Sequence, residues 1–222
     1  MRALALALFS FGFLAAGLVV FAVLWSGTGP YADLARDNHV QSITFIRRDG
    51  QPLSFDLVAV LDVHRKWSTY VTGGTDAPPA FEADVRFTDD EYRHMADVRR
   101  VFDGAKLLVP VGLFVMIIRL QRARAVSTLE MWHLLRDGAL LAAAIVALVG
   151  IVAIVAFEPL FLAFHYAFFP QGNFLFDPAT SNLVRLYPDW YWEGISLRVG
   201  LSFVLLALLV AGVAHLRLRT AK

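Results

Sequence analysis

The sequence contains no cysteine, only three lysines and few charged residues for its length. Without cysteine the chain has no disulfide framework, no thiolate nucleophile or zinc site, and no lipid-modified cysteine of its own. Charged residues make up 18% of the 222 residues and hydrophobic ones 58%, whereas a soluble domain has about 25% and 45–50%. This composition excludes a soluble domain and a disordered chain. A formal net charge of +1 also argues against a nucleic-acid binder. The sequence therefore predicts a membrane protein.

Four apolar stretches match a membrane-spanning helix, which needs about 20 residues to cross a hydrocarbon core of about 30 Å. Ala3–Trp25, Gly138–Phe157 and Val199–Leu216 contain no Asp, Glu, Lys or Arg. Leu107–Ile118 is shorter, but a basic residue at each end can extend to the interface. The first stretch exceeds the usual apolar region of a signal peptide and lacks an A-x-A cleavage site after it, so we interpret it as an uncleaved signal anchor.

The predicted fold class is a membrane protein with four transmembrane helices, a small mixed α+β extracytoplasmic domain between the first two, and an aromatic-rich outer loop between the last two. The expected parts are residues 1–25 (transmembrane helix 1), 26–104 (extracytoplasmic domain), 105–120 (transmembrane helix 2), 121–137 (cytoplasmic loop), 138–157 (transmembrane helix 3), 158–196 (outer interfacial loop), 197–216 (transmembrane helix 4) and 217–222 (cytoplasmic tail).

Basic residues in the short connections predict the orientation. The connection between the second and third apolar stretches contains four arginines: Arg119, Arg122, Arg124 and Arg136. The C-terminal tail contains two more arginines and Lys222. Both termini are therefore expected in the cytoplasm, with residues 26–104 and 158–196 outside. Residues 26–104 contain 13 acidic and 9 basic residues, a net charge of −4, which does not oppose translocation.

Local patterns predict elements within the extracytoplasmic domain. Val40–Arg48 is rich in β-branched residues and precedes a turn at Arg48–Gln51. Phe55–Tyr70 is interpreted as a helix with Ser54 as N-cap, although its opening alternation is also typical of a strand. Alternation at Phe81–Phe87 predicts a half-buried strand. Pro159–Phe176 carries no Asp, Glu, Lys or Arg, but contains Pro and Gly and many aromatics, so we expect an interfacial or re-entrant segment and not a fifth span.

Two of the six histidines stand out as candidates for catalysis. Thr88 and Glu91 match a capping box, which predicts a helix that carries His94 and Asp97 on one face, where the carboxylate can orient the imidazole. His165 lies among aromatics, where an apolar setting favours the neutral base. Two imidazoles on one side of the membrane can act as general base and general acid. We assign His94 as the base and His165 as the acid, with the reverse equally open.

Other interpretations of these residues stay open. His94 is then a residue of the helix surface and His165 an interfacial side chain. A metal site built from His94, Asp97 and His165 is a further alternative, but no His-Glu-x-x-His spacing supports it and no metal or other cofactor is expected. The sequence contains no G-x-S-x-G motif, so it does not support a Ser-His-Asp hydrolase. The remaining histidines are expected to be solvated or interfacial: His39, His64, His133 and His215.

Three more residues are candidates for a supporting role. Arg185 is the only Arg or Lys of the outer loop and can meet a phosphate or a developing oxyanion, or anchor the loop to headgroups. Asp177 is expected to cap a short helix with Pro178 at its first position. Tyr166 follows His165 directly. Trp190–Trp192 are expected to form an aromatic belt at the start of the last span.

The stretch Phe87–Val98, FTDDEYRHMADV, resembles the F-T-x-x-E-x-x-H-M-x-D-V signature of a small bacterial family of four-span membrane proteins, the lipoprotein intramolecular transacylases. Phe164-His165 and Phe176–Pro188 resemble its second block. The resemblance follows nearly the whole chain in order, from span and outer domain through two spans and an outer loop to the last span.

This resemblance implies an acyltransferase of the bacterial cytoplasmic (inner) membrane with an extracytoplasmic active site. Its substrate is a diacylated lipoprotein within membrane lipid, and its product is the N-acyl S-monoacylglyceryl (lyso) form, made by moving the sn-2 acyl chain to the amine of the N-terminal cysteine. The family's two functional histidines correspond to His94 and His165. A non-catalytic membrane scaffold, or a hydrolase or acyltransferase acting on another lipid-linked substrate, is the alternative.

Overall fold

The computed structural model describes residues 2–81 and 85–220 and divides into two compact units. The membrane unit comprises residues 1–22, 105–156 and 197–222, and the hairpin unit comprises residues 23–104 and 157–196. The elements in chain order are α1 (Arg2–Trp25), α2 (Thr28–Asp37), β1 (Ser42–Ile46), β2 (Pro52–Asp56), α3 (Leu57–Val71), α4 (Asp89–Val126), α5 (Thr128–Val155), α6 (Phe157–Phe168), α7 (Asn182–Leu186) and α8 (Asp189–Thr220).

Four helices of the described chain are long and apolar enough to cross a membrane, namely α1, α4, α5 and α8. They confirm the number of predicted spans and contain three of them in full, whereas the third, predicted to end at Phe157, ends with α5 at Val155. The helices extend beyond those spans, because α4 begins at Asp89 and its membrane-spanning part is only the apolar stretch between Lys106 and Arg119. A single residue, Ser127, separates α4 from α5, so most of the predicted cytoplasmic loop is helical.

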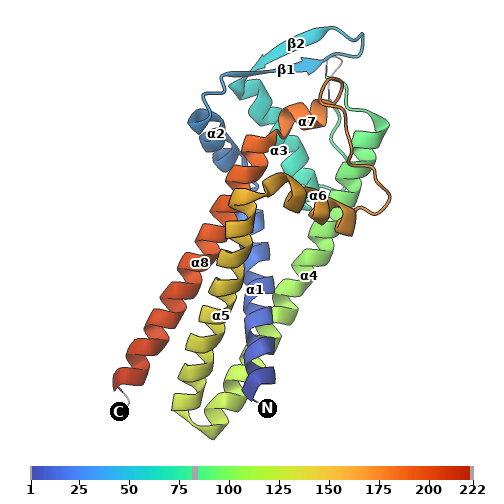
Figure 1. Ribbon diagram of the computed structural model, residues 1–222. Helices are drawn as coiled ribbons and strands as arrows, with labels where there is room; N and C mark the ends of the chain where they lie inside the picture. The colour runs from blue at the N-terminus through green and yellow to red at the C-terminus, as the bar shows by residue number, and fades with distance from the viewer. Residues whose placement is uncertain (1, 82–84, 221–222) are drawn as a thin grey trace. The chain divides into compact units, whose positions relative to one another are not determined.

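Within the membrane unit, α1 contacts each of the other three helices (Figure 1). Gly12 meets Gly112 of α4 so closely that a Cβ at Gly12 would lie 2.7 Å from the Gly112 carbonyl oxygen. On α5, Gly138 packs under Phe9 and its carbonyl oxygen accepts a hydrogen bond from the Ser10 hydroxyl at 3.1 Å. Small residues at these crossings let the backbones approach, which is how helices associate where lipid competes for apolar surface.

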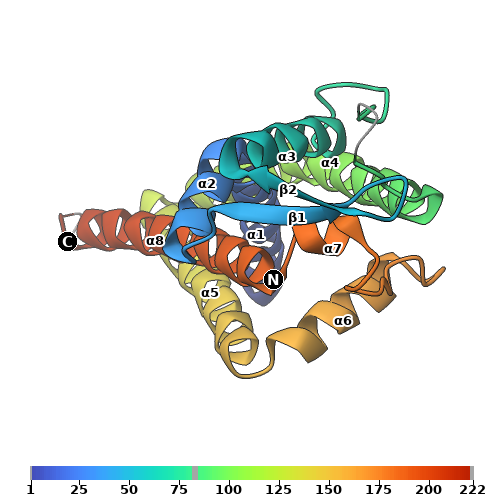
Figure 2. The ribbon, with the colours of Figure 1, turned by 90° about the horizontal axis from the view of Figure 1, so that it is seen from above.

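The hairpin unit begins with the predicted strand and turn. Strands β1 and β2 pair antiparallel, with Ser42 opposite Asp56 and Ile46 opposite Pro52. Gly50 has a φ of +83°, which an L side chain adopts only with strain, and the Asp49 side chain accepts the Gln51 N–H at 3.0 Å. Seen in Figure 2, the hairpin lies beside α3 and α7.

Helix α3 starts later than the sequence predicts. Ser54 was expected as N-cap but lies in β2, and the side chain of Asp56 instead accepts the Ala59 N–H at 2.9 Å. The strand-like alternation at Phe55 therefore belongs to a strand, because pairing with β1 continues to Asp56. The prediction for His64 was also wrong: it is 1% exposed, and its ring packs on Tyr31 with ring centroids 4.4 Å apart.

The predicted strand Phe81–Phe87 falls partly on residues 82–84, which lie outside the described residues. Its described ends are not strand, although the Arg86 N–H reaches the Ile46 carbonyl at 3.4 Å. The capping box that follows is confirmed, because the Thr88 N–H donates to Glu91 Oε2 at 2.6 Å and the Glu91 N–H to Thr88 Oγ1 at 3.2 Å. Helix α2 was not predicted at all.

The aromatic segment after α5 forms a helix of 12 residues, α6, which is too short to be a fifth span. Asp177 was expected to cap a helix but caps a turn, accepting the Ala179 N–H at 2.8 Å. Helix α7 starts at Asn182, four residues later than expected, with Ser181 as N-cap. The expected belt at Trp190–Trp192 is also revised, because Tyr191 is 5% exposed and belongs to the core of the hairpin unit.

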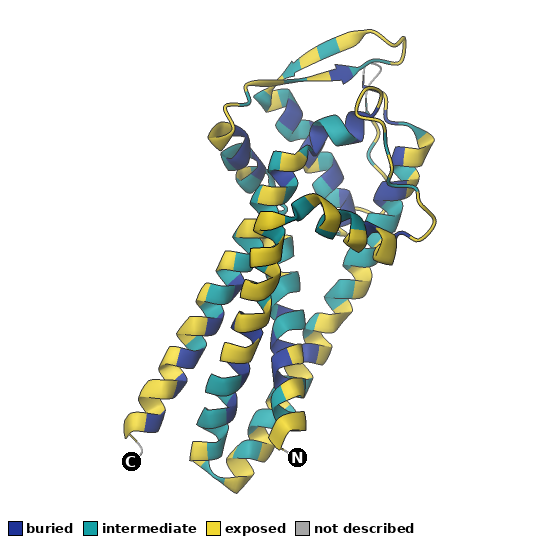
Figure 3. Cartoon of the chain, viewed as in Figure 1, coloured by how far each residue is buried: buried dark blue, intermediate teal, exposed yellow. Residues whose placement is uncertain are grey.

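Two buried polar side chains join the segments of the hairpin unit. Glu91 (1% exposed) accepts the Ser181 hydroxyl at 2.6 Å and the Leu183 N–H at 2.7 Å. Asn182 (1% exposed) accepts the Ile46 N–H and donates to the carbonyls of Ile46 and Arg86, all within 2.7 Å. Figure 3 shows buried residues of α3, α4 and α7 in dark blue. These contacts fix the start of α4 relative to α7.

Candidate active site

His94 lies one turn inside α4, directly after the Glu91 network that fixes the start of this helix. His165 lies near the end of α6. His94 is 7% exposed and His165 is 8% exposed. Their rings are nearly parallel, with an angle of 19° between the ring planes and centroids 6.0 Å apart. The structure therefore brings together the two histidines that the sequence singled out, although 71 positions separate them in the chain (165 − 94).

Aromatic side chains surround this histidine pair. Phe169, which is 2% exposed, meets His94 and His165 with ring centroids 4.8 and 5.4 Å away. Phe176 adds a third contact to His94, and further rings pack on His165: Phe161, Phe164 and Phe174. Several aromatics expected at a headgroup boundary thus form the wall of the site. This wall keeps most water away from the imidazoles.

Burial determines the protonation of both imidazoles. It lowers the pKa of His94 to about 4, with nearby His165 adding to the effect and Asp97 and a hydrogen bond to Asn173 opposing it. Burial likewise lowers the pKa of His165, against the opposing hydrogen bond to the Phe161 carbonyl. Both rings are therefore mainly neutral at pH 7 and can accept a proton.

His165 also has a defined tautomer. Its Nδ1 lies 2.8 Å from the carbonyl oxygen of Phe161, one turn earlier on α6. A carbonyl oxygen only accepts, so Nδ1 carries the hydrogen and Nε2 of the neutral ring carries the lone pair. Nδ1 of His94, in contrast, is buried without a hydrogen-bond partner among the described residues.

Asp97 contacts other partners than the sequence predicted. Its carboxylate accepts from Arg100, from Gln171 Nε2 at 2.7 Å and from Asn173 Nδ2 at 2.7 Å, and no hydrogen bond to His94 is seen among the described contacts. Its influence on His94 is through its charge and through Asn173. Sequence reasoning missed Gln171 and Asn173, since no local spacing relates them to a carboxylate 74 and 76 positions away.

Among the described contacts, the side chains of the other supporting candidates touch neither histidine directly. Arg185 donates to the backbone carbonyls of Thr44 and Ala179 at 3.1 and 2.9 Å, which ties α7 to β1. Asp177 serves its turn. Tyr166 is 57% exposed and packs edge-on against Phe174, which in turn contacts His165. Of these three, only Tyr166 is linked to the pair by described contacts.

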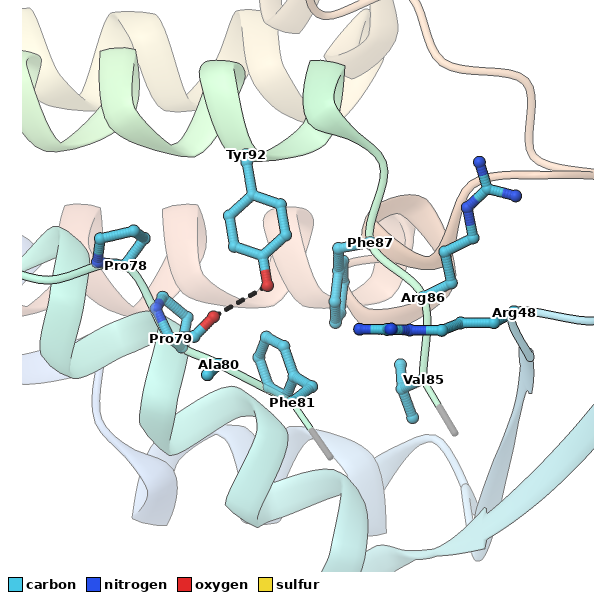
Figure 4. A pocket seen from close by; sticks show the side chains of 9 residues that line it. All are labelled: Arg48, Pro78, Pro79, Ala80, Phe81, Val85, Arg86, Phe87 and Tyr92. Atoms are coloured by element: carbon cyan, nitrogen blue, oxygen red, sulfur yellow. Dashed lines mark hydrogen bonds between the residues drawn. The ribbon is translucent and has the colours of Figure 1, made fainter. Parts of the chain in front are cut away.

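No group of three His, Asp or Glu side chains in the described part of the chain is arranged to hold a metal ion. The metal alternative built on His94, Asp97 and His165 therefore finds no support in the geometry. A separate hollow, drawn in Figure 4, is lined by aromatics, prolines and two arginines, and Tyr92 donates to the Pro79 carbonyl at 2.8 Å there. It contains none of the candidate site residues.

We compared the fold and the sequence of this chain with those of known proteins. The fold is similar to that of the membrane-integral lipoprotein intramolecular transacylase Lit from Bacillus cereus, with a TM-score of 0.76 and 13% identity over 100% of this chain and 97% of that one. Two variants of the same protein, in which a histidine is replaced by arginine or by alanine, give TM-scores of 0.67 and 0.68 at 12% and 13% identity. Each covers 100% of this chain and 95% of the other.

Among proteins with curated descriptions, none matches this sequence. The sequence model of the family "lipoprotein intramolecular transacylase Lit", however, matches residues 57–192, which is more than half of the chain and includes both histidines. This chain therefore belongs to the lipoprotein intramolecular transacylases, a family of membrane-integral acyltransferases.

Proposed function

We propose that this protein moves the sn-2 acyl chain of a diacylglyceryl lipoprotein to the α-amine of its N-terminal cysteine, with His94 and His165 transferring the protons. The product is the N-acyl S-monoacylglyceryl form of the lipoprotein. The observation that carries this proposal is the pair of buried, neutral imidazoles, 6.0 Å apart, within an aromatic wall. Such a pair reaches two atoms of one reacting centre at the same time.

The chemistry needs no co-reactant. The α-ammonium first gives a proton to one neutral imidazole, and the amine nitrogen then attacks the ester carbonyl carbon. The other imidazole takes the second proton from this nitrogen, while the first returns its proton to the sn-2 oxygen as the bond between this oxygen and the carbonyl carbon breaks. The proton left on the second imidazole passes to solvent, which restores two neutral rings. The reaction is an isomerisation within one molecule, so positioning of the amine against the ester supplies much of the rate and no acyl-enzyme is required.

The hydrogen bonds favour the second of the two role assignments that the sequence leaves open. His165 donates from Nδ1 to the Phe161 carbonyl, so its Nε2 has the free lone pair that a base needs. His94 has Asp97 and Asn173 nearby, and both stabilise the protonated ring. We therefore propose that His165 is the general base and His94 the general acid.

The proposal also includes a location. The helix ends that meet at the short α4–α5 connection carry arginines, and so does the end of α8. Such arginines favour the cytoplasmic side of the membrane for these helix ends, so the hairpin unit would lie outside the bacterial inner membrane. Exposed aromatics of α6, such as Phe164, Tyr166 and Phe168 (46–57% exposed), suit contact with lipid at the interface. A lipid-anchored substrate would reach the site from that side.

The test expresses the protein in a bacterium that makes diacylated lipoproteins but does not acylate their N-termini. Tandem mass spectrometry of one N-terminal lipopeptide then locates the two acyl chains. We expect an unchanged acyl count with one chain on the amine for the wild type, and loss of this product, by at least about a hundredfold, for His94→Ala and His165→Ala.

The matched control is His39→Asn, at an exposed histidine of the same unit whose φ of 56° asparagine tolerates. It should retain full transfer. A diacylglyceryl peptide that stays unchanged with well-expressed wild-type protein would contradict the proposed reaction, and normal transfer by either alanine variant would contradict the role of that histidine.

A further inference from the structure

An open hollow of about 520 Å³ lies along α4 in the hairpin unit. Its lining is polar throughout except for one alanine: Asp90, Arg93, Ala96, Asp97, Arg100, Gln171 and Asn173. The four charged residues of α4 follow one another at intervals of three or four positions, so they form a stripe along one face of the helix. In the proposed transfer of the acyl chain, Asp97 and Asn173 act on His94, but no part of the substrate occupies this hollow.

The hollow adjoins the histidine pair through two of its own lining residues. Asn173 donates a hydrogen bond to Asp97 at 2.7 Å, and both residues raise the pKa of His94. Next to Asn173, Phe174 packs on the His165 ring at 5.1 Å between centroids. The reacting centre therefore has two different neighbours, an aromatic wall that suits acyl chains and a polar hollow that does not.

The charges of the hollow balance. Arg93 pairs with Asp90 and Arg100 pairs with Asp97, each pair three positions apart on α4. A phosphate-bearing headgroup is best held by a surplus of cationic donors, which this lining lacks. Two amide side chains and two neutral ion pairs instead offer donors and acceptors in equal measure, as the backbone of a polypeptide requires.

The length of the stripe also suits a peptide. Asp90 and Arg100 are ten positions apart, which is about 15 Å along a helix. An extended chain covers this distance with about four residues.

We propose that this hollow binds the first residues of the lipoprotein polypeptide after the modified cysteine, in an extended conformation. The inference rests on the proposed function, because only a lipoprotein substrate places a peptide next to the reacting amine. The aromatic wall then takes the diacylglyceryl part and the hollow takes the peptide, so the amine lies between them beside the histidines.

The experiment compares two synthetic substrates with purified protein in detergent micelles. One is an S-diacylglyceryl-cysteine followed by four residues, and the other is the S-diacylglyceryl-cysteine amide alone. The variant Ala96→Trp fills the hollow, and Ala96→Ser leaves it open. We expect Ala96→Trp to reduce kcat/KM at least about tenfold for the peptide substrate, mainly through KM, and to leave the short substrate unchanged.

A second variant covers the case in which Ala96→Trp does not fold. Arg93→Ala removes one donor from the hollow and is matched by Arg36→Ala, since each arginine is exposed and pairs with an aspartate three positions earlier on a helix of the same unit. Arg93→Ala should raise KM for the peptide substrate only, and Arg36→Ala should change neither substrate.

The outcomes separate the two proposals. If Ala96→Trp lowers kcat/KM equally for both substrates, the hollow binds the lipid part and the peptide site is refuted. If it lowers kcat/KM for neither substrate, the peptide site is also refuted. Failure of the proposed function looks different, because wild-type protein would then convert neither substrate.

Discussion

At the scale of single residues, the partners of Asp97 decide what it does for His94. An aspartate three positions after a histidine on a helix predicts direct contact with the imidazole. The carboxylate instead accepts from Arg100 and from two amides of the segment after α6. Its charge still favours the protonated ring, as the proposed role of His94 as the general acid requires.

This account predicts the effect of Asp97→Asn on the pH dependence of transfer. Without the carboxylate the pKa of His94 falls further below its value of about 4. An acid with a lower pKa loses its proton at lower pH, so the alkaline limb of the pH–rate profile moves to lower pH. A pKa that is lower by about 1 makes the protonated fraction of His94 at neutral pH about tenfold smaller. The measurement is kcat from pH 3 to pH 8, a range that includes this pKa of about 4. The loss of kcat should grow from about twofold at pH 3 to about tenfold at neutral pH.

The control is Asp62→Asn, because Asp62 also pairs with an arginine three positions later but lies on α3. Its profile should match that of the wild type. If Asp97→Asn lowers kcat at every pH by the same factor, Asp97 only anchors the loop and its electrostatic role is refuted.

At the scale of elements, Glu91 joins the start of α4 to the start of α7. Its carboxylate accepts from the Thr88 N–H, the Ser181 hydroxyl and the Leu183 N–H. Buried donors that lose their acceptor cost about 1–3 kcal/mol each. This carboxylate therefore holds His94 in place by holding the helix that carries it.

We expect Glu91→Ala to lower the free energy of unfolding by about 3 kcal/mol or more, because two buried donors and one half-buried donor lose their partner. Glu91→Gln keeps an acceptor oxygen and should have a smaller effect. Asp90→Ala, at an exposed neighbour that pairs only with Arg93 among the described contacts, should cost under about 1 kcal/mol. Denaturant unfolding of the purified protein measures all three, and equal effects of Glu91→Ala and Asp90→Ala would show that the network is dispensable.

The same elements show how far the sequence predicts the structure. The four apolar helices, the hairpin turn at Gly50 and the capping box at Thr88 depend on neighbouring residues, and all were predicted. The N-cap at Ser181 and the burial of His64 depend on contacts with distant segments, and neither was. At the site the pair His94 and His165 was predicted, whereas Asn173 lacks any local signal because its partner Asp97 is 76 positions away.

At the scale of the whole molecule, the absence of cysteine makes the proposed orientation directly testable. Single cysteines at Asp49, in the exposed hairpin turn, and at Arg124, near the end of α4, need no background mutations. We expect a membrane-impermeant maleimide to label Asp49→Cys in intact spheroplasts and Arg124→Cys only after the membrane is permeabilised. The reverse pattern would refute the proposed topology.

The contacts that fix the site join segments of the chain that are synthesised at different times. Tyr31 donates to the Leu186 carbonyl across 155 positions, and Glu91 reaches Leu183 across 92. Two apolar helices, the apolar part of α4 and all of α5, lie between Glu91 and Leu183 in the sequence. A nascent chain that has inserted only these helices therefore holds His94 without its partner and without the clamp on α4. A chain cut short before α7 contains His165 but lacks the Ser181 and Leu183 donors that Glu91 binds, so we expect it to transfer no acyl chain.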